Sequence, residues 1–322
     1  MTSTPNSSRL RTFRSIPRRS SSSGVIALLV LALGVMPPAG ASAQERAPGD
    51  NRTIVPRDTA HSKRRQTLFT YRDAILAAGF AGLTVAMFPL DENVARQIRQ
   101  DSTFNGFTQK SAVGFETIST PGAYVIGAGI YVFGRVTKRQ DIADFGWHGT
   151  EAVLVANGLT GFLKGTLGRA RPFVSNDSNP RDFRFGGGFG EAERQSFPSG
   201  HTSTAFAAAA AVTSETRRLH PKALPYVATI MYGGATLVGL SRMYHNKHWA
   251  SDVALGAAVG TFSGLKVVRY SHAHPNNKVD RVMLHAVIAP DGAHNSAFGC
   301  PRPAVLHVLK EGTLDGMPDV CR

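Results

Sequence analysis

The chain has 322 residues, of which 42% are hydrophobic and only 18% are charged. This composition excludes a disordered chain and indicates a helix-packed or membrane-associated protein that can bury a sizeable core. The formal charge of +14 raises the question of a nucleic-acid partner. Residues 1–43 hold five arginines and no acid, so their removal would lower the charge to +9, and we expect no nucleic-acid partner.

Residues 1–43 have the three parts of a bacterial export signal. A basic stretch, RLRTFRSIPRRSSSSG, precedes the apolar run VIALLVLALGVM, and the small residues ASA stand before Gln44. The apolar run is short for a membrane span, so a signal peptide is favoured over an uncleaved anchor. Export would expose Cys300 and Cys321 to oxidising conditions, and the sequence leaves open whether they pair.

Residues 44–70 are polar and interrupted by proline, which predicts a linker. A helical domain is expected over 71–270, because its apolar segments are rich in Ala, Leu and Gly and lack the alternation of strands. The sequence therefore predicts an all-α bundle of about six core helices. The segments are Ala74–Leu90, Pro121–Gly134, Ala152–Leu163, Thr202–Ser214, Ala223–Leu240 and Val253–Leu265. The polar tail, 271–322, is expected to be irregular or to form a short hairpin, and we assign it no function.

The relation of this bundle to a membrane stays open, because most segments are shorter than the about 20 apolar residues of a spanning helix. The basic stretches RVTKR, ETRRLHPK and KVVRY lie at the end opposite the motifs described below. If the helices span, the positive-inside rule places the motifs outside the cytoplasm. A cleaved signal peptide followed by six spans would place them inside instead. We expect an exported protein of the bacterial cell envelope with a site facing the periplasm, either integral to the membrane or soluble in the periplasm.

Three short blocks lie at the ends of the last four apolar segments. KGTLGRARP follows the third segment, FPSGHTS precedes the fourth, and SRMYHNKHWASD joins the fifth to the sixth. Consecutive helices with short connections run antiparallel, so these segment ends lie at one end of the bundle. The order of the segments therefore predicts that the three blocks converge.

The residue types in these blocks suit a phosphate-like oxyanion. Three cations and the backbone amides of a helix start favour a bound anion, through charge-assisted hydrogen bonds and the helix dipole. Two histidines supply a nucleophile or base and an acid, and a carboxylate lies one helical turn after the second histidine. Such a set suits phosphoryl transfer without a metal or other cofactor. The residues are Lys164, Arg171, Ser199, Gly200, His201, Arg242, His248 and Asp252.

Together the blocks resemble the three-part signature of the type 2 phosphatidic acid phosphatase family. This family shares its site design with bacterial acid phosphatases and vanadium haloperoxidases. The matching residues are Lys164-x6-Arg171-Pro172, Pro198-Ser199-Gly200-His201 and Ser241-Arg242-x5-His248-x3-Asp252. The resemblance covers residues from about Ala152 to about Leu265.

The resemblance implies a role for each residue. His248 would attack phosphorus and form a phosphohistidine, His201 would protonate the leaving oxygen and later activate water, and Asp252 would orient His248. The phosphate would be held by Lys164, Arg171, Ser199, Gly200 and Arg242. These roles agree with the charge that spreads over the equatorial oxygens of a phosphoryl-transfer transition state.

A metal site built from His245, His248 and Asp252 is the sharpest rival for the third block, but the neighbouring cations disfavour it. His245 is expected to be a loop residue near the mouth of the site. Asp144, Trp147, His148 and Glu151 fall at the opposite end and are expected to be structural. The polar connector from Phe173 to Ser196 is expected to be a solvated loop beside the site.

The sequence thus favours a metal-independent phosphatase that acts on a phosphomonoester or diphosphate. An apolar setting favours a lipid-linked substrate, such as phosphatidate or a polyprenyl diphosphate, and association with a membrane. Three alternatives stay open: a vanadium-dependent haloperoxidase, a soluble non-specific periplasmic acid phosphatase, and a non-catalytic phosphate-binding or transport component.

Overall fold

The computed structural model describes residues 68–100, 113–274 and 277–283. The expected signal peptide, most of the linker, both cysteines and the expected hairpin after residue 283 lie outside these ranges. Within them every regular element is helical, apart from an isolated bridge between Arg169 and Phe183. The prediction of an all-α fold is confirmed.

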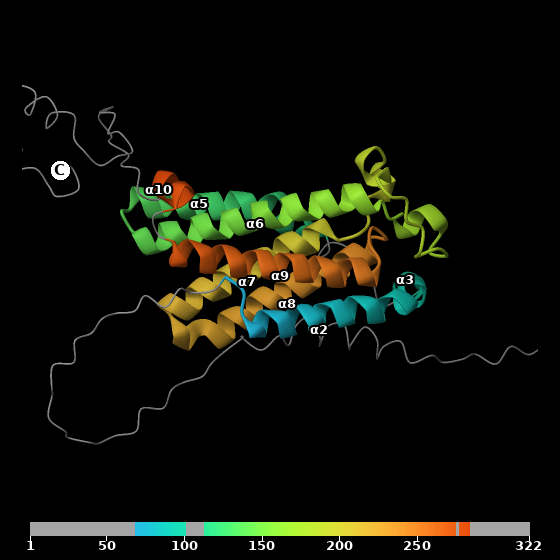
Figure 1. Ribbon diagram of the computed structural model, residues 1–322, viewed down its shortest axis with the longest axis horizontal. Helices are drawn as coiled ribbons and strands as arrows, with labels where there is room; N and C mark the ends of the chain where they lie inside the picture. Colours follow the sequence, from blue (N-terminus) through green and yellow to red (C-terminus); the bar gives the residue numbers. More distant parts are fainter. Residues whose placement is uncertain (1–67, 101–112, 275–276, 284–322) are drawn as a thin grey trace, which may run out of the picture.

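All six predicted segments form helices. In Figure 1 the long helices lie side by side along the longest axis, and successive helices run in opposite directions. The helices are α2 (Tyr71–Met87), α3 (Asp91–Gln100), α5 (Ala123–Val136), α6 (Gln140–Leu167), α7 (Gly200–Leu219), α8 (Leu224–Tyr244), α9 (Ala250–Ala273) and α10 (Lys278–Met283).

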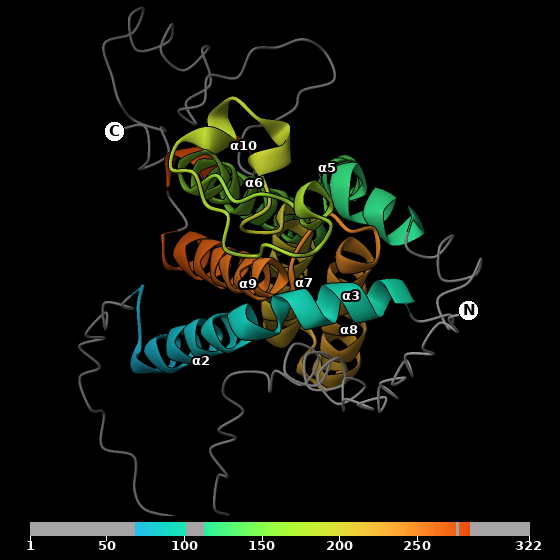
Figure 2. The same ribbon diagram turned by 90° about the vertical axis from the view of Figure 1, so that its right-hand side faces the viewer.

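The two ends of the bundle carry different structures. The connector 168–199, which contains three short 3-10 turns, lies with α3 at the right-hand end of Figure 1, and α10 lies at the left-hand end. Figure 2 looks onto the end that carries the connector and α3. The ends of α6 and α8 and the starts of α7 and α9 all meet there, as the segment order predicts.

Helix α9 lies against α7 at close range because glycines on α9 face the α7 backbone. A Cβ atom on Gly260 would lie 2.2 Å from the carbonyl oxygen of Ser203, and one on Gly264 would lie 2.5 Å from that of Ala207. Only residues without a side chain allow two helix backbones to approach so closely. The alanines 209–211 of α7 are almost fully buried. This contact fixes the start of α9 relative to the start of α7.

Three of the described helical stretches are long and apolar enough to cross a membrane: Tyr71–Ile98, Pro221–Tyr244 and Ala250–Ala273. The third lies mostly inside the bundle, whereas the apolar windows of the first two are mostly exposed. Large apolar side chains are also exposed along the outer faces of α5 and α6. Exposed examples are Ile75, Val85, Val125, Phe133, Leu154, Phe162, Tyr226 and Ile230. Apolar exposure of this extent is typical of a surface that contacts lipid or another protein.

The helices extend beyond the predicted segments in two places. Helix α6 begins at Gln140, well before the apolar segment that starts at Ala152. Its first half is more polar, and one of its polar residues, His148, is almost fully buried. Helix α9 continues past the expected domain end at 270 to Ala273, with Ser271 buried, and residues 278–283 of the expected tail form α10.

Candidate active site

The structure brings the residues of the three blocks together at one end of the bundle. Lys164 lies in the last turn of α6, and its ammonium group would lie 3.9 Å from a Cβ atom on Gly200, the first residue of α7. His248 lies in the turn between α8 and α9, and its ring contacts the carbonyl oxygen of Ser196 just before α7. The predicted convergence is therefore observed.

His248 is buried and its ring is fixed through one nitrogen. Nδ1 lies 2.7 Å from the carbonyl oxygen of Ser196 and 3.5 Å from Oδ2 of Asp252. Burial lowers the pKa of His248 to about 3, so the ring is neutral at pH 7. A neutral ring that donates from Nδ1 keeps its lone pair on Nε2. The expected orientation of His248 by Asp252 is therefore shared with a backbone carbonyl, which is the closer acceptor.

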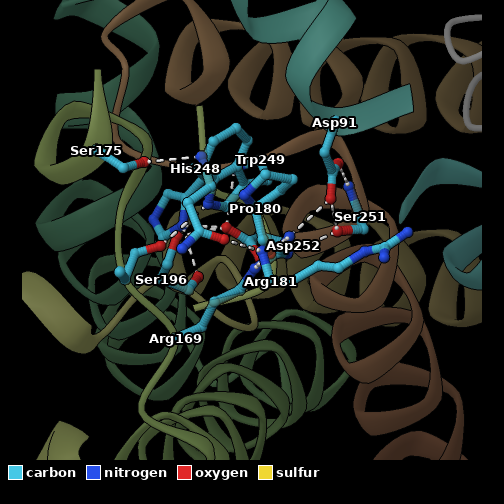
Figure 3. A network of polar contacts seen from close by, with 12 residues as sticks. Asp91, Arg169, Ser175, Pro180, Arg181, Ser196, His248, Trp249, Ser251 and Asp252 are labelled. Atoms are coloured by element: carbon cyan, nitrogen blue, oxygen red, sulfur yellow. Dashed lines mark hydrogen bonds and ion pairs between the residues drawn. The ribbon is translucent and has the colours of Figure 1, made fainter. Parts of the chain in front are cut away.

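Asp252 is held by a buried network that the sequence did not reveal (Figure 3). Its Oδ1 accepts a hydrogen bond from Arg169 Nη1 at 2.6 Å, and its Oδ2 accepts one from the backbone N–H of Trp249 at 2.8 Å. The same guanidinium donates from Nη2 to Oδ2 of Asp91 at 2.7 Å. Asp91 also accepts from the backbone N–H of Ser251 at 2.8 Å. Arg169 thus bridges two buried carboxylates, one at the start of α3 and one at the start of α9.

The guanidinium of Arg169 lies among four aromatic rings. Its carbon atom is 4.9 to 5.5 Å from the ring centroids of Phe88, Phe183, Phe197 and Trp249. One of these rings is itself held in place: the indole N–H of Trp249 donates a hydrogen bond to the carbonyl oxygen of Ala170 at 3.0 Å. Cation–π contacts and complete hydrogen bonding make burial of this charge tolerable. The network fixes the first turn of α9, and with it Asp252, in one position.

Lys164, Arg171 and Arg242 form the cationic part of the site. Burial, and then the charge of Arg171, lower the pKa of Lys164 to about 8. Burial and the charge of Arg242 lower the pKa of Arg171. Both pKa values thus reflect the positive charge of neighbouring site residues. Within the described residues, Arg171 Nε, Arg242 Nε and Arg242 Nη1 are buried without a well-aligned hydrogen-bond acceptor, although Nη1 forms an ion pair with Glu116, so donors remain for an anion.

Glu116 is an additional acidic residue in this space. Its Oε2 lies 2.6 Å from Arg242 Nη1 and 3.4 Å from His245 Nδ1, and its Oε1 lies 3.8 Å from His201 Nε2. Burial raises the pKa of Glu116, but the hydrogen bond and charge of Arg242, together with His201 and His245, outweigh it and lower the pKa overall, so the group is a carboxylate at neutral pH. Burial and then the charge of Arg242 lower the pKa of His201 to about 4.

His245 and His248 face different groups. His245 points to Glu116, whereas His248 points to Ser196 and Asp252, whose oxygens already accept from Arg169 and Trp249. His245 is also partly exposed, as expected for a residue near the mouth. The arrangement gives no shared position for a metal between His245, His248 and Asp252.

At the start of α7, the backbone amide of Ser199, an expected phosphate-binding residue, is not available to an anion. The backbone N–H of Ser199 donates to the carbonyl oxygen of Asp252 at 2.9 Å, so this amide is already used inside the protein. The side chain of Ser199 accepts from Thr202 Oγ1 at 2.8 Å and makes no capping bond to the helix. The amides left for an anion are those of the first turn of α7, beginning at Gly200.

The connector is more than a solvated loop. Its backbone carbonyls accept from three site residues: Gln195 from Lys164 Nζ at 2.7 Å, Ser196 from His248, and Pro180 from Arg169 Nε at 2.9 Å. Ser196 is fully buried. The expectation of a plain surface loop was wrong at Pro180 and at the C-terminal end of the connector, because buried cationic and imidazole N–H groups need acceptors that the helices do not supply.

Part of the chain matches a known protein family. Residues 146–275 match the model of the PAP2 superfamily. We call these residues the PAP2 region. The PAP2 region contains all eight residues predicted from the three blocks, and the resemblance drawn from the sequence is confirmed. Asp91 and Glu116 lie before it, so two of the residues that shape the site come from outside the PAP2 region.

One curated relative is the lipid A 1-phosphatase of Porphyromonas gingivalis, 45% identical over 69 residues. That alignment covers 21% of this chain and 15% of the relative, so the chain matches only a small part of its length. Among solved structures, a transmembrane PAP2 type phosphatidylglycerolphosphate phosphatase from Bacillus subtilis is 21% identical, with a TM-score of 0.45 over 65% of this chain and 99% of that one. LpxE from Aquifex aeolicus is 21% identical, with a TM-score of 0.40 over 56% of this chain and 96% of that one.

Two network residues outside the three-part signature, Arg169 and Asp91, could have been selected from their positions in the sequence. Arg169 lies two residues before Arg171 in the block GRARP, where a second arginine is not needed for the phosphate. Asp91 follows directly on the first apolar segment, at the position of a helix start. Glu116 had no signal, because its contacts join it to residues far along the chain.

Proposed function

We propose that this protein is a metal-independent phosphatase that hydrolyses a lipid-linked phosphomonoester or diphosphate through a phosphohistidine intermediate. The observation that carries the proposal is the fixed, neutral ring of His248 next to three cations. Its Nδ1 is engaged by Ser196 and Asp252, which leaves the Nε2 lone pair as a nucleophile. Lys164, Arg171 and Arg242 provide the positive charge that a phosphoryl-transfer transition state requires.

In the first step, His248 Nε2 attacks phosphorus and the bond from phosphorus to the leaving oxygen breaks. His201 donates a proton to that oxygen. In the second step, His201 takes a proton from water, the water oxygen attacks phosphorus, and the phosphorus–nitrogen bond breaks to release phosphate. The pKa of His201 is low in the cationic pocket, and the negative charge of a bound phosphate favours its protonated form.

An apolar cavity next to the site supports a lipid-linked substrate. The cavity has a volume of about 270 Å³ and is lined by residues of α5, α6, α7 and α8 and of the stretch before α5. Three lining residues are one helical turn from site residues: Ser119 from Glu116, Ala205 from His201 and Val238 from Arg242. An acyl or prenyl chain could therefore enter the cavity while its phosphate contacts the cations.

We further propose that the protein is associated with the cell-envelope membrane and that its site faces the periplasm. The apolar faces of α2 and α8 support membrane contact. Basic residues gather at the end opposite the site, including Arg135, Arg139, Arg218 and Lys222.

Alkaline carbonate washing of membranes tests whether the protein is integral to the membrane: release of the protein would refute integration. Labelling of single cysteines, placed at Arg218 and at Ser178 in a Cys300→Ser, Cys321→Ser background, tests which end is outside.

The catalytic proposal is tested with His248→Ala and the matched variant His245→Ala, three residues earlier in the same turn. Both are assayed on phosphatidate, a polyprenyl diphosphate, the 1-phosphate of lipid A and a soluble sugar phosphate. We expect His248→Ala to lose turnover and His245→Ala to keep most of it, with vanadate inhibiting the parent and chelators leaving its initial rate unchanged. Full turnover by His248→Ala would overturn the mechanism. Phosphate binding without release from any ester would favour a binding protein instead.

A further inference from the structure

A second cluster of titratable groups lies at the opposite end of the bundle. His148 Nδ1 and His272 Nε2 each lie 2.7 Å from the same oxygen, Oε1 of Glu215. These residues come from α6, α9 and α7, and the two imidazole rings meet edge to face with centroids 5.0 Å apart. His148 and Glu215 are each only 2% exposed. One ligand atom from each of the three lies within 4.8 Å of the others.

Hydrogen bonding within the described residues leaves this cluster incomplete. His148 Nε2 is buried, has no hydrogen-bond partner there, and lies 3.7 Å from Oδ2 of Asp280. A neutral imidazole carries one N–H, so it cannot donate to Glu215 and Asp280 at the same time; only a protonated ring could donate to both. A metal ion on Nδ1 would leave the hydrogen on Nε2, facing Asp280. A carboxylate behind a metal-bound histidine is the usual arrangement of such ligands.

Negative charge also gathers here. Asp144, His148 and Glu151 are spaced four and three residues apart, so they lie on one face of α6. Glu215 adds a third acidic side chain, which contacts both histidines through Oε1. Glu151 Oε2 is buried and lacks a hydrogen-bond partner among the described residues. A divalent cation would offset charge that is costly to bury.

We propose that His148, Glu215 and His272 bind a divalent metal ion of the zinc type. Two imidazoles and a carboxylate match the ligands that zinc prefers, whereas magnesium and calcium prefer oxygen ligands alone. Donor atoms around a tetrahedral zinc ion lie about 3.3 Å apart. Each of the two 2.7 Å distances from a histidine nitrogen to Glu215 Oε1 would therefore lengthen by about 0.6 Å when zinc binds. Asp144, one turn before His148, or water would complete the coordination.

The role of this site is structural. Along α6, His148 is about 24 Å from Lys164, too far for the metal to contact the phosphate. The ion would join the start of α6 to the ends of α7 and α9, and through Asp280 it would hold α10 against them. The proposal is independent of the phosphatase mechanism.

The test uses the full chain, stripped with a chelator that is then removed. Bound zinc is measured by equilibrium dialysis and elemental analysis, and thermal unfolding is followed with and without zinc chloride. The variants are His272→Ala and the matched control His274→Ala, an exposed histidine two residues further on. His272 carries the test because its side chain is partly exposed, whereas loss of the buried His148 endangers folding.

We expect the parent and His274→Ala to bind one zinc ion per chain at this end. At a free concentration of 100 times Kd, their unfolding temperature should rise by about 5–10 °C. His272→Ala should lose this ion and most of the rise. Cobalt in place of zinc should give the visible absorption of a tetrahedral site in the parent and not in His272→Ala.

No zinc binding by the parent, or equal binding by His272→Ala, would overturn the proposal and leave a hydrogen-bonded cluster only. Turnover at low temperature is expected to be the same in stripped and loaded protein, so neither result depends on the other.

Discussion

Arg242, an expected phosphate ligand, is paired with a carboxylate of its own chain: its Nη1 lies 2.6 Å from Oε2 of Glu116. A carboxylate and a phosphate group both bind a guanidinium through charge-assisted hydrogen bonds. Glu116 therefore competes with a phosphate group for Arg242. Because Glu116 is partly exposed, the pair is weak enough for a substrate to displace it.

Glu116→Gln should bind phosphate more tightly than the parent. A partly exposed ion pair contributes about 0.5–1 kcal/mol, so its loss should lower the inhibition constant of inorganic phosphate about two- to five-fold. The constant is measured from inhibition of ester hydrolysis. Glu92→Gln is the control, since Glu92 pairs with Arg96 on α3. Unchanged or weaker inhibition in Glu116→Gln would show that Glu116 does not compete with the anion.

Arg169→Gln should destabilise the protein strongly, because it leaves the buried carboxylates of Asp91 and Asp252 without their cation. Breaking a buried ion pair from one side costs about 3–5 kcal/mol. Arg169→Lys should not restore the loss, since one ammonium cannot match the two-sided geometry of a guanidinium.

Thermal or denaturant unfolding measures this loss, with Arg184→Gln as the control. Arg184 forms an exposed ion pair with Glu191, so its loss should cost at most about 1 kcal/mol. Equal unfolding temperatures for Arg169→Gln and Arg184→Gln would contradict the importance of the buried network.

The pH dependence of the rate should report Lys164. Burial and the charge of Arg171 lower its pKa to about 8, and the ammonium holds positive charge only below that pH. We expect kcat/KM to fall about tenfold per pH unit above pH 8 as Lys164 loses its proton. Lys164→Arg should remove this fall, because an arginine stays charged. The second ionisation of a phosphate ester lies near pH 6, so the substrate does not cause it. A flat profile between pH 8 and 10 in the parent would contradict this role.

The sequence was sufficient to predict the bundle and the convergence of its motifs. Apolar segments rich in Ala, Leu and Gly specify helices, and short connections force them to alternate in direction, so Lys164, His201 and His248 had to meet at one end. The spacing of His248 and Asp252 also separated His248 from His245, and the structure shows the two rings facing different groups.

The rest of the site depends on contacts that the sequence does not encode locally. Asp91 contacts Ser251, 160 residues away, and Glu116 contacts Arg242 from before the PAP2 region. The first half of α6 was missed because it is more polar, and its His148 is buried against the rule that polar side chains face water. Such pairings follow from the three-dimensional packing of segments, which spacing along one segment does not reveal.

The close contact of α7 and α9 gives a last prediction. A Cβ atom on Gly260 would lie 2.2 Å from Ser203 O and 2.8 Å from the backbone nitrogen of Ala207, and backbone atoms cannot move away as a side-chain end can. Gly260→Ala should therefore force α9 away from α7 and lower the free energy of unfolding by about 1–3 kcal/mol. It should also lower turnover, because Asp252 and His248 are carried by the start of α9.

Gly158→Ala is the matched control, since a Cβ atom on this exposed glycine of α6 would meet nothing within 4 Å. Alanine favours a helix over glycine by up to about 1 kcal/mol, so this variant should be at least as stable as the parent. Thermal unfolding and initial rates are compared for both variants. If Gly260→Ala matched Gly158→Ala in both, the approach of α7 to α9 would not be what positions the site.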